Sequence, residues 1–507
     1  MIEDKVISRV LLTVNKYSGE ISSLKTAVSQ GEYTLDCSYY SRLLVWKTVA
    51  IVETLQITEW DSKLHSSRVV YHQLSKDTIV PWHSLEPDNP FYVPLAAFAA
   101  SSTKGRTTIS SSRSLKRSAQ RELTINDPLS EVEQKISTTG GSHDSDLELL
   151  QAIMMDIERL FPGEEFFRDD KHRKQLIEVL YVWSKCNLSI GYKQGIHEIL
   201  GLIYFNMYKE SIQVDKSKTT DKNELTILNL YNQQYLKHDL FTIFNKFMVG
   251  GGIITTYYDS ERTLIEAIDQ FNVYLMKVDQ VVYYTLLHKL KLESQLWIMR
   301  YFRLLLSREI NDLNQSSAYW DLLICTPNLS CIPELMSFCI VVLLIRVKHD
   351  ILTGDFSECL ELLLHYPLQE PIDDPNYFQS FQVLNSTFMI GDILNDAFKL
   401  YEQRSHDLKL YELGLKLNKK YNPNLRVSMS FSSAPTTRES SPAKSSMDKP
   451  RLPSEEPKGE PTQISNKKLK YTQANLIESR ANQAQFEKMR MEMRLKKKVQ
   501  QMLNSPN

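Results

Sequence analysis

Two short stretches hold side chains that could act together on a phosphoryl group. Residues 153–159 read Ile-Met-Met-Asp-Ile-Glu-Arg, and residues 191–195 read Gly-Tyr-Lys-Gln-Gly. On a helix, Asp156 and Arg159 are neighbours three residues apart, so the carboxylate can hold the guanidinium in one orientation. Such an arginine can stabilise charge on a transferring phosphoryl group, and one supplied by a partner protein accelerates GTP hydrolysis by about three to five powers of ten.

The second stretch predicts an exposed turn, because Gly191 and Gly195 bracket three polar residues and an apolar helix follows from Ile196. In an extended turn Tyr192 and Gln194 would face a ligand together. The Gln194 carboxamide could then accept from a water and donate to a partner's backbone. Taken singly, both stretches also have a purely structural interpretation, as a surface ion pair and as a plain turn before a helix.

The elements that must position these residues are helices. Apolar residues recur at helical spacing, as at Leu176, Val179, Leu180 and Trp183. Glycine is sparse, with 16 in 507 residues, and alternating stretches joined by hairpin turns are missing from the sequence. We therefore expect an all-α protein. The predicted helices include residues 147–160, 196–208, 225–247, 261–275, 296–307, 334–348 and 356–364.

Composition excludes several classes of function. Lys plus Arg at 60 almost cancels Asp plus Glu at 61, so net charge gives no case for nucleic-acid binding. The six cysteines form no C-x-x-C pair and no zinc-like grouping with histidine, which predicts reduced thiols in a cytoplasmic protein and no metal site. No signal peptide is recognisable at the N-terminus. The apolar run 336–345 is too short to cross a bilayer and suits a buried helix.

Three segments have the composition of disordered chain or tail. Residues 101–121 contain six basic and no acidic residues among many serines, and a disordered insertion is predicted at about 101–145. Residues 426–465 are rich in Ser, Pro, Lys and Glu and predict a disordered linker. Residues 466–507 predict a basic, partly helical tail, either simply solvated or in contact with a membrane or partner. Its drifting apolar stripe supports a coiled coil only weakly.

Three ordered motifs resemble those of the TBC-domain GTPase-activating proteins, which act on Rab (Ypt) GTPases. The resemblance covers about residues 35–370, with a helical lead-in at 1–34 and a helical extension at 371–425. It implies a multi-helix TBC-type fold. The motifs are R-x-x-x-W at Arg42 and Trp46, I-x-x-D-x-x-R at Ile153, Asp156 and Arg159, and Y-x-Q at Tyr192 and Gln194.

The resemblance implies a role for each motif residue. Arg159 matches an arginine finger that stabilises transition-state charge, and Gln194 matches a glutamine finger that orients the attacking water. Asp156 matches the acid that steadies the arginine, and Tyr192 the aromatic beside the glutamine. Arg42 and Trp46, in the first motif, are expected mainly to brace the catalytic half, where Ile153 opens the second motif.

The resemblance also implies a partner and a setting. The partner would be a GTP-bound Rab, which itself binds the GTP and Mg²⁺, so that no cofactor of this chain's own is expected. Residues 126–130 and 359–367 look closest to a fungal member of the branch that works on endosomal and Golgi Rabs. We therefore expect a cytoplasmic protein at those membranes. The alternatives are a catalytically silent Rab-binding scaffold and a membrane tether governed by residues 466–507.

Two further expectations concern charged side chains in the second half. Arg300, Arg303 and Arg308 are expected to pair with Glu309 or Asp321 rather than to touch a partner. Glu198 is expected to cap or brace the third-motif turn.

Overall fold

The computed structural model describes residues 2–34, 36–94, 142–214, 221–310, 312–366 and 385–425. The chain divides into two units, residues 1–427 and 428–507, and the second lies outside the described residues. Within the described ranges the structure is helical and contains no β-strand, only an isolated bridge between Ile212 and Asn232. The all-α prediction is confirmed.

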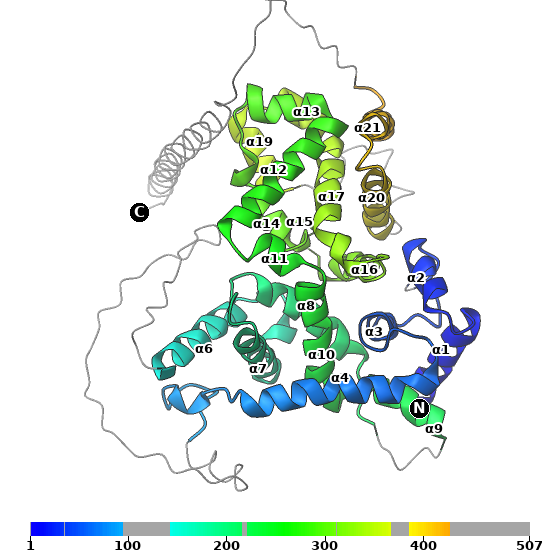
Figure 1. Cartoon of the computed structure of the whole chain (residues 1–507), viewed down its shortest axis with the longest axis vertical. Coiled ribbons are helices and arrows are strands. Elements are labelled where there is room, and N and C mark those ends of the chain that lie inside the picture. The colour runs from blue at the N-terminus through cyan, green and yellow to red at the C-terminus, as the bar shows by residue number, and fades with distance from the viewer. Residues whose placement is uncertain are drawn as a thin grey trace, which may run out of the picture. The chain divides into compact units, whose positions relative to one another are not determined.

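The first half of the described unit lies in the lower part of Figure 1. Its short helical turns are η1 (Thr48–Val52), η2 (Trp82–Ser84), η3 (Glu165–Arg168), η4 (Gln233–Tyr235) and η5 (Lys246–Gly250). Its α-helices are α1 (Ile2–Lys16), α2 (Ile21–Ser29), α3 (Arg42–Lys47), α4 (Ile57–Asp77), α6 (Ser142–Glu158), α7 (Asp170–Cys186), α8 (Ile196–Glu210), α9 (Lys222–Tyr231) and α10 (Leu236–Asn245).

The second half lies in the upper part of the same view. Its short turns are η6 (Thr285–Lys289), η7 (Ser294–Leu296) and η8 (Leu329–Cys331). Its α-helices are α11 (Ile253–Tyr257), α12 (Glu261–Val278), α13 (Gln280–Tyr284), α14 (Ile298–Arg303), α15 (Ser307–Ile310), α16 (Leu313–Ile324), α17 (Ile332–Arg346), α18 (Lys348–Thr353), α19 (Phe356–Leu364), α20 (Asn385–Glu402) and α21 (Asp407–Tyr421).

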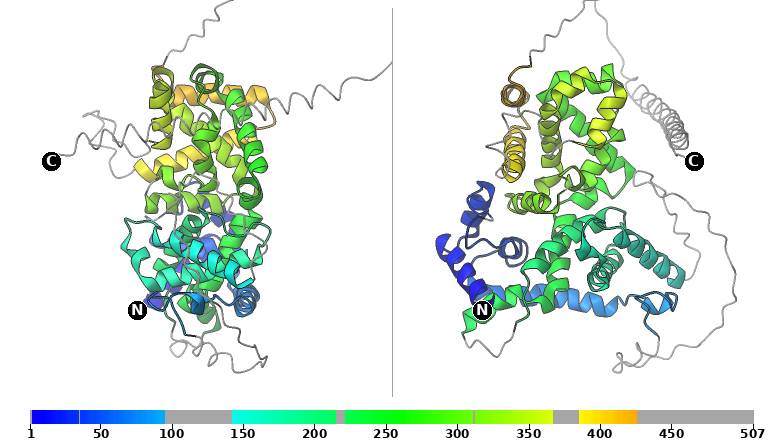
Figure 2. Two further views of the ribbon diagram at one scale, coloured as in Figure 1. Left: turned by 90° about the vertical axis from the view of Figure 1, so that its left-hand side faces the viewer. Right: turned by 180° about the vertical axis from the view of Figure 1, so that it is seen from behind.

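Two buried helices organise the two halves. In the first half, α8 is buried from Ile196 to Met207 and packs against α3, α6, α7, α10 and α16. In the second half, α17 packs against α12, α14, α20 and α21, and α20 runs alongside it in Figures 1 and 2. Burial of apolar side chains around each helix is the main stabilising contribution. The buried helix α8 therefore provides a fixed support for the loop that precedes it, residues 191–195.

The stretch Leu329–Arg346 is long and apolar enough to cross a membrane by length and composition, and 72% of it is buried inside the protein. The apolar run is thus longer than residues 336–345, but its burial agrees with the prediction of a core helix. Because neighbouring helices surround it, its apolar character is explained by packing.

Two predicted helices are broken in the structure. The prediction of one helix over 225–247 is wrong, because Asn232 is extended and its side chain accepts from the Gln234 amide, which ends α9 and starts a new turn. The prediction of one helix over 296–307 is also wrong. Leu305 and Leu306 take the left-handed conformation, with φ of 48° and 65°, and separate α14 from α15.

The predicted soft segments lie mostly outside the described residues. This holds for residues 101–141 of the insertion, for the linker at 426–465, and for the basic tail and weak coiled coil at 466–507. The helix α6 begins at Ser142, so it takes up the last four residues of the predicted insertion. In the extension at 371–425 the structure describes α20 and α21.

Candidate functional site

The arginine of the second motif follows the end of α6. Ile153 is fully buried and anchors the helix, whereas the Arg159 side chain is 45% exposed. One nitrogen of Arg159 donates to Oδ1 of Asp156, whose side chain is only 7% exposed. A cation at a helix C-terminus is also favoured by the helix dipole. The i, i+3 pairing expected from the sequence is present, and it leaves the arginine side chain half-exposed.

Tyr192 completes the support of that carboxylate. Its hydroxyl donates to Oδ2 of Asp156 over 2.7 Å, so each oxygen of Asp156 has a partner. Burial, followed by the Asp156 charge, raises the pKa of Tyr192 well above its ordinary value, and the phenol stays protonated as a donor. The expectation that Tyr192 and Gln194 face a ligand together is wrong for Tyr192, which turns inward to the carboxylate.

Gln194 lies on the exposed side of the same loop and makes no hydrogen bond to any residue in the described ranges. The loop is shaped by Gly191 and Gly195, with φ of 66° and 103°. Gly195 is also closely packed, because a Cβ there would lie 3.2 Å from Cδ2 of Leu304. A side chain at Gly195 would be strained and crowded at once. The loop therefore presents Gln194 outward from a constrained backbone.

His197 connects the loop to the carboxylate and was not predicted as part of the site. Its Nδ1 accepts from the Gly195 amide over 3.3 Å and lies 3.2 Å from the Tyr192 hydroxyl and 3.5 Å from Oδ2 of Asp156. Burial lowers the pKa of His197, although the Asp156 charge opposes this. A neutral ring that accepts at Nδ1 carries its proton on Nε2.

Glu198 and Arg308 brace the loop from the second half. Arg308 donates through Nε and one terminal nitrogen to the two oxygens of Glu198, over 2.8 and 2.7 Å. The Glu198 hydrogen bond raises the pKa of Arg308. The expected partners of Arg308 were Glu309 and Asp321, so that pairing is wrong, whereas Arg300 does donate to Glu309 over 2.8 Å. The expectation that Glu198 braces the turn agrees with this contact.

The part of the chain that contains this site matches a known protein family. Residues 110–352 match the family described as the Rab-GTPase-TBC domain, and these residues include Asp156, Arg159 and Gln194. The chain contains a Rab-GTPase-TBC domain. The matched residues begin later than the predicted 35–370, so Arg42 and Trp46 lie outside them.

Relatives of the TBC domain occur in animals and amoebae. The chain is 26% identical over 277 residues to TBC1 domain family member 5 of Mus musculus, which covers 50% of this chain and 33% of that protein. It is 22% identical over 475 residues to TBC1 domain family member 5 homolog A of Dictyostelium discoideum, covering 76% and 37%. The chain thus spans about a third of the length of these curated relatives.

A solved structure supports the TBC fold over a longer range. The crystal structure of the Ypt/Rab-GAP domain of Gyp1p matches with a TM-score of 0.51 and 16% identity, and it covers 79% of this chain and 99% of that chain. At this identity the match concerns the fold. It includes far more of the chain than residues 110–352.

The first motif lies in a different part of the structure from the second and third motifs. Arg42 donates to both oxygens of Asp321 over 2.8 and 3.0 Å, and to Asn206 over 2.9 Å. Trp46 and Tyr40 donate to the same Asp321 carboxylate, each over 2.7 Å. This buried cluster ties α3 to α16. The structure therefore gives Arg42 and Trp46 the bracing contacts expected from the sequence.

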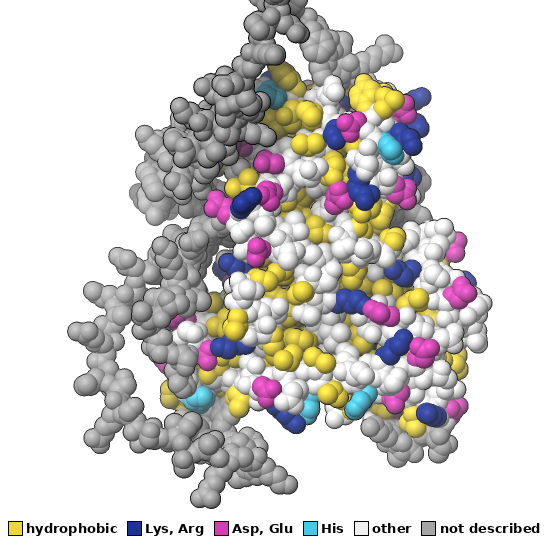
Figure 3. Space-filling view, in the orientation of Figure 1, with side chains coloured by type: hydrophobic (Ala, Val, Ile, Leu, Met, Phe, Trp, Pro, Cys, Tyr) yellow, Lys and Arg dark blue, Asp and Glu magenta, His cyan; other side chains and the backbone are white. Residues whose placement is uncertain are grey.

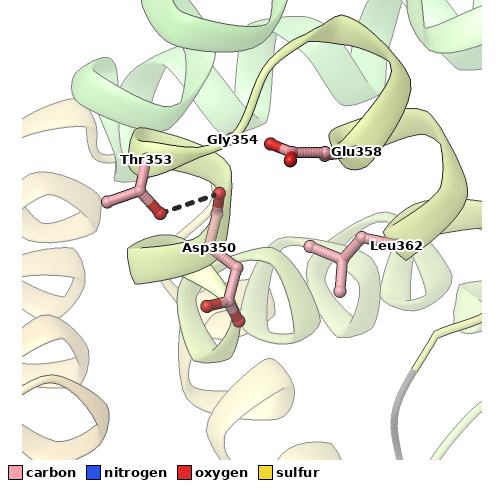
Figure 4. Close-up of a pocket in the computed structure, with 5 residues that line it drawn as sticks. All are labelled: Asp350, Thr353, Gly354, Glu358 and Leu362. Atoms are coloured by element: carbon pink, nitrogen blue, oxygen red, sulfur yellow. Dashed lines mark hydrogen bonds between the residues drawn. The ribbon is translucent and has the colours of Figure 1, made fainter.

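A separate pocket lies at α18 and α19, lined by Asp350, Thr353, Gly354, Glu358 and Leu362 (Figure 4). None of these residues belongs to the three motifs. In the described ranges no group of three or more His, Cys, Asp or Glu side chains is placed to hold a metal ion. The candidate site is therefore the exposed face formed by the end of α6 and the loop before α8.

Proposed function

We propose that this chain is a GTPase-activating protein for a small GTPase of the Rab/Ypt class. The observation that carries the proposal is a half-exposed arginine whose carboxylate partner is fixed from behind. Asp156 accepts from Arg159 with one oxygen and from Tyr192 with the other. A TBC domain and its likeness to a Ypt/Rab-GAP domain support the choice of partner.

The proposed mechanism assigns different work to the two exposed side chains. Arg159 supplies positive charge where the phosphoryl oxygens become more negative, and the carboxylate beside it limits its rotation before the GTPase arrives. Gln194 accepts from the attacking water and donates to the partner's backbone. The GTP and Mg²⁺ are bound by the GTPase, and this chain contributes no cofactor.

The cellular setting is part of the proposal. A cytoplasmic protein at Golgi or endosomal membranes follows from the resemblance of residues 126–130 and 359–367 to one branch of the family. Residues 466–507 would add an electrostatic contact to a membrane or coat. Flotation with vesicles, with and without residues 466–507, tests that contact, and loss of lipid binding together with activity would favour the tether alternative.

The central test is single-turnover GTP hydrolysis across a panel of purified Rab GTPases. We expect wild type to accelerate at least one Rab, and Arg159→Ala and Gln194→Ala each to remove most of the acceleration. Arg262→Ala is the matched control, because Arg262 is an exposed arginine on α12 paired only with Glu266 in the described structure. It should behave as wild type.

Two outcomes would overturn the proposal. If both variants accelerate hydrolysis as well as wild type, the two-residue mechanism is wrong. If the chain binds GTP-loaded Rabs tightly but speeds none of them, it is the catalytically silent scaffold.

A further inference from the structure

Helix α21 has two faces of opposite character. Its inner face buries Leu410, Gly414 and Leu417 against the rest of the described unit. Gly414 allows a very close approach, because a Cβ there would lie only 2.0 Å from the carbonyl oxygen of Val278. Asn418 adds a polar contact, since its Nδ2 donates to Asp279 over 2.8 Å. The helix is therefore held firmly, and its outer face is fixed in direction.

The outer face of α21 carries large apolar side chains in solvent. Leu408 is 71% exposed, Leu415 is 53% exposed, and Tyr411 is 42% exposed. They are spaced by three and four residues, so they share one side of the helix. Single exposed apolar residues are common, but an aligned set on one helix is typical of an interaction surface.

Basic side chains flank these residues. Lys409, Lys416 and Lys419 are exposed, and none makes an ion pair with a residue in the described ranges. By contrast Lys420, which is also exposed, is paired with Asp396 over 2.7 Å. Glu412 is the acidic residue among them. Three lysines against one glutamate leave the outer face positively charged.

Another surface with exposed leucines has acidic residues beside them. On α1, Leu11 and Leu12 line a pocket with Asp4 and Glu224. On α21, exposed apolar side chains thus lie beside lysines that make no ion pair in the described ranges, and Figure 3 shows hydrophobic side chains next to lysine or arginine side chains over this helix.

We propose that the outer face of α21 binds the surface of an anionic lipid bilayer. Leucine side chains would enter the acyl boundary, tyrosine would sit at the headgroup level, and the lysines would contact anionic headgroups. The three apolar side chains stand out from one helix instead of lining a groove. A fluid bilayer can adapt to such a shape, whereas a folded partner would need a matching hollow. This inference does not depend on GTPase activation.

The test is cosedimentation of the full chain with phosphatidylcholine vesicles that contain about a third phosphatidylserine. We expect binding that weakens with added salt, because the lysine contribution is screened. Replacing each of Lys409, Lys416 and Lys419 by Gln should weaken binding by about fivefold per lysine. The double change Leu408→Ser and Leu415→Ser should weaken it by about tenfold or more.

The matched control is Leu12→Ser, which removes an equally exposed leucine, 52% exposed, from the pocket that Asp4 and Glu224 line beside α1. It should bind vesicles as wild type does. Because residues 466–507 are also basic, all variants are compared in the full chain, where that contribution is the same. Thermal unfolding should be unchanged in the α21 variants, since the replaced side chains lie on the outer face.

Several results would overturn the inference. Absence of binding by wild type would do so, as would equal binding by wild type and both sets of α21 variants. If the leucine changes abolish a dimer seen by sedimentation but leave vesicle binding intact, the face binds a second copy. If the lysine changes affect only binding to an acidic polypeptide, the partner is a protein.

Discussion

Two arginine–aspartate pairs in this chain have the same chemistry and opposite surroundings. The side chains of Arg159 and Asp156 are 45% and 7% exposed, whereas those of Arg42 and Asp321 are both 11% exposed. In each pair a tyrosine hydroxyl donates to Oδ2 of the aspartate over 2.7 Å. Each carboxylate thus accepts from one arginine and one tyrosine, and Asp321 accepts from Trp46 as well. The two arginines differ more strongly, in their exposure and in their other contacts.

The difference lies in the remaining donors of each guanidinium. Arg42 uses a further nitrogen on Asn206, so two of its three nitrogens donate to buried partners. Arg159 donates only to Asp156 among the described residues, and its side chain is 45% exposed. A largely buried arginine that donates to partners on two other helices holds those helices together. One that is fixed at a single point and open elsewhere can still receive a ligand.

The largest expected effect is at the Arg159–Asp156 pair, where the rate of GTP hydrolysis should change and the stability of the fold should not. Arg159→Ala should lower GTPase acceleration by about a thousandfold or more. Its free energy of unfolding should change by less than about 1 kcal/mol, because the Arg159 side chain is half-exposed and Tyr192 still donates to the buried Asp156 carboxylate. Single-turnover hydrolysis and urea unfolding measure the two quantities. A large loss of stability would mean that Arg159 is also a brace.

At the Arg42–Asp321 pair we expect the reverse, a loss of stability with an unchanged rate of GTP hydrolysis. Arg42→Ala leaves the Asp321 carboxylate without its cation, which should destabilise the fold by about 3–5 kcal/mol. The fraction that remains folded should keep its rate of GTPase acceleration. Urea unfolding, followed by activity per folded molecule at low temperature, checks this. Equal stability of variant and wild type would contradict the role assigned to the cluster.

The two tyrosines sharpen the comparison. Tyr192→Phe removes a hydrogen bond to a charged group, worth about 1.5–3 kcal/mol, and should reduce the maximal rate by about tenfold without weakening GTPase binding. Tyr40→Phe removes the equivalent bond at Asp321 and should reduce stability with no change in rate. Titrating the activator in single-turnover assays separates rate from affinity. If the two variants lose the same amount of rate and of stability, the two pairs do not have different roles.

The smallest expected effect is on pH dependence. Burial lowers the pKa of His197 in the folded state, so the unfolded chain binds a proton first as pH falls below about 6.5. Stability therefore falls with pH through this window, until the folded-state pKa is also passed. Protonated Nδ1 can no longer accept from Gly195, so the rate should fall in the same direction.

The conservative variant His197→Asn isolates this contribution. Its amide oxygen can still accept from Gly195 and does not titrate. Wild type should lose more stability and more rate than the variant as the pH is lowered from neutral towards 5. Parallel pH profiles would show that other groups, such as the buried His172, cause the acid sensitivity.

Local patterns predicted the parts of the site that lie close in sequence. Asp156 and Arg159 share a helix face, so their contact follows from spacing. The inward direction of the Tyr192 side chain does not follow from spacing, because it depends on the left-handed backbone at Gly191 and Gly195. Alternation of side chains along an extended turn predicted the wrong direction for it. Gly195 itself was readable as a turn residue.

Contacts across long separations could not be read from one sequence. Glu198 and Arg308 are 110 residues apart, and nothing in either segment identifies the other. The helical spacing of apolar residues also continues across two helix ends, so the sequence predicted one helix where the structure has two. Leu306 donates from its amide to the Tyr301 carbonyl in a left-handed turn, and no glycine marks that position. The cap at Asn232 was, by contrast, a visible signal.

Helix α20 packs against α17 but is synthesised later, and this order has a consequence for folding on the ribosome. The apolar helix α17 ends at Arg346, and α20 is complete only at Glu402. At about 5–20 residues per second, roughly 3–11 seconds separate the two on the ribosome. During that interval the side of α17 that α20 will cover is without its neighbour, so nascent chains are most open to aggregation or chaperone capture there.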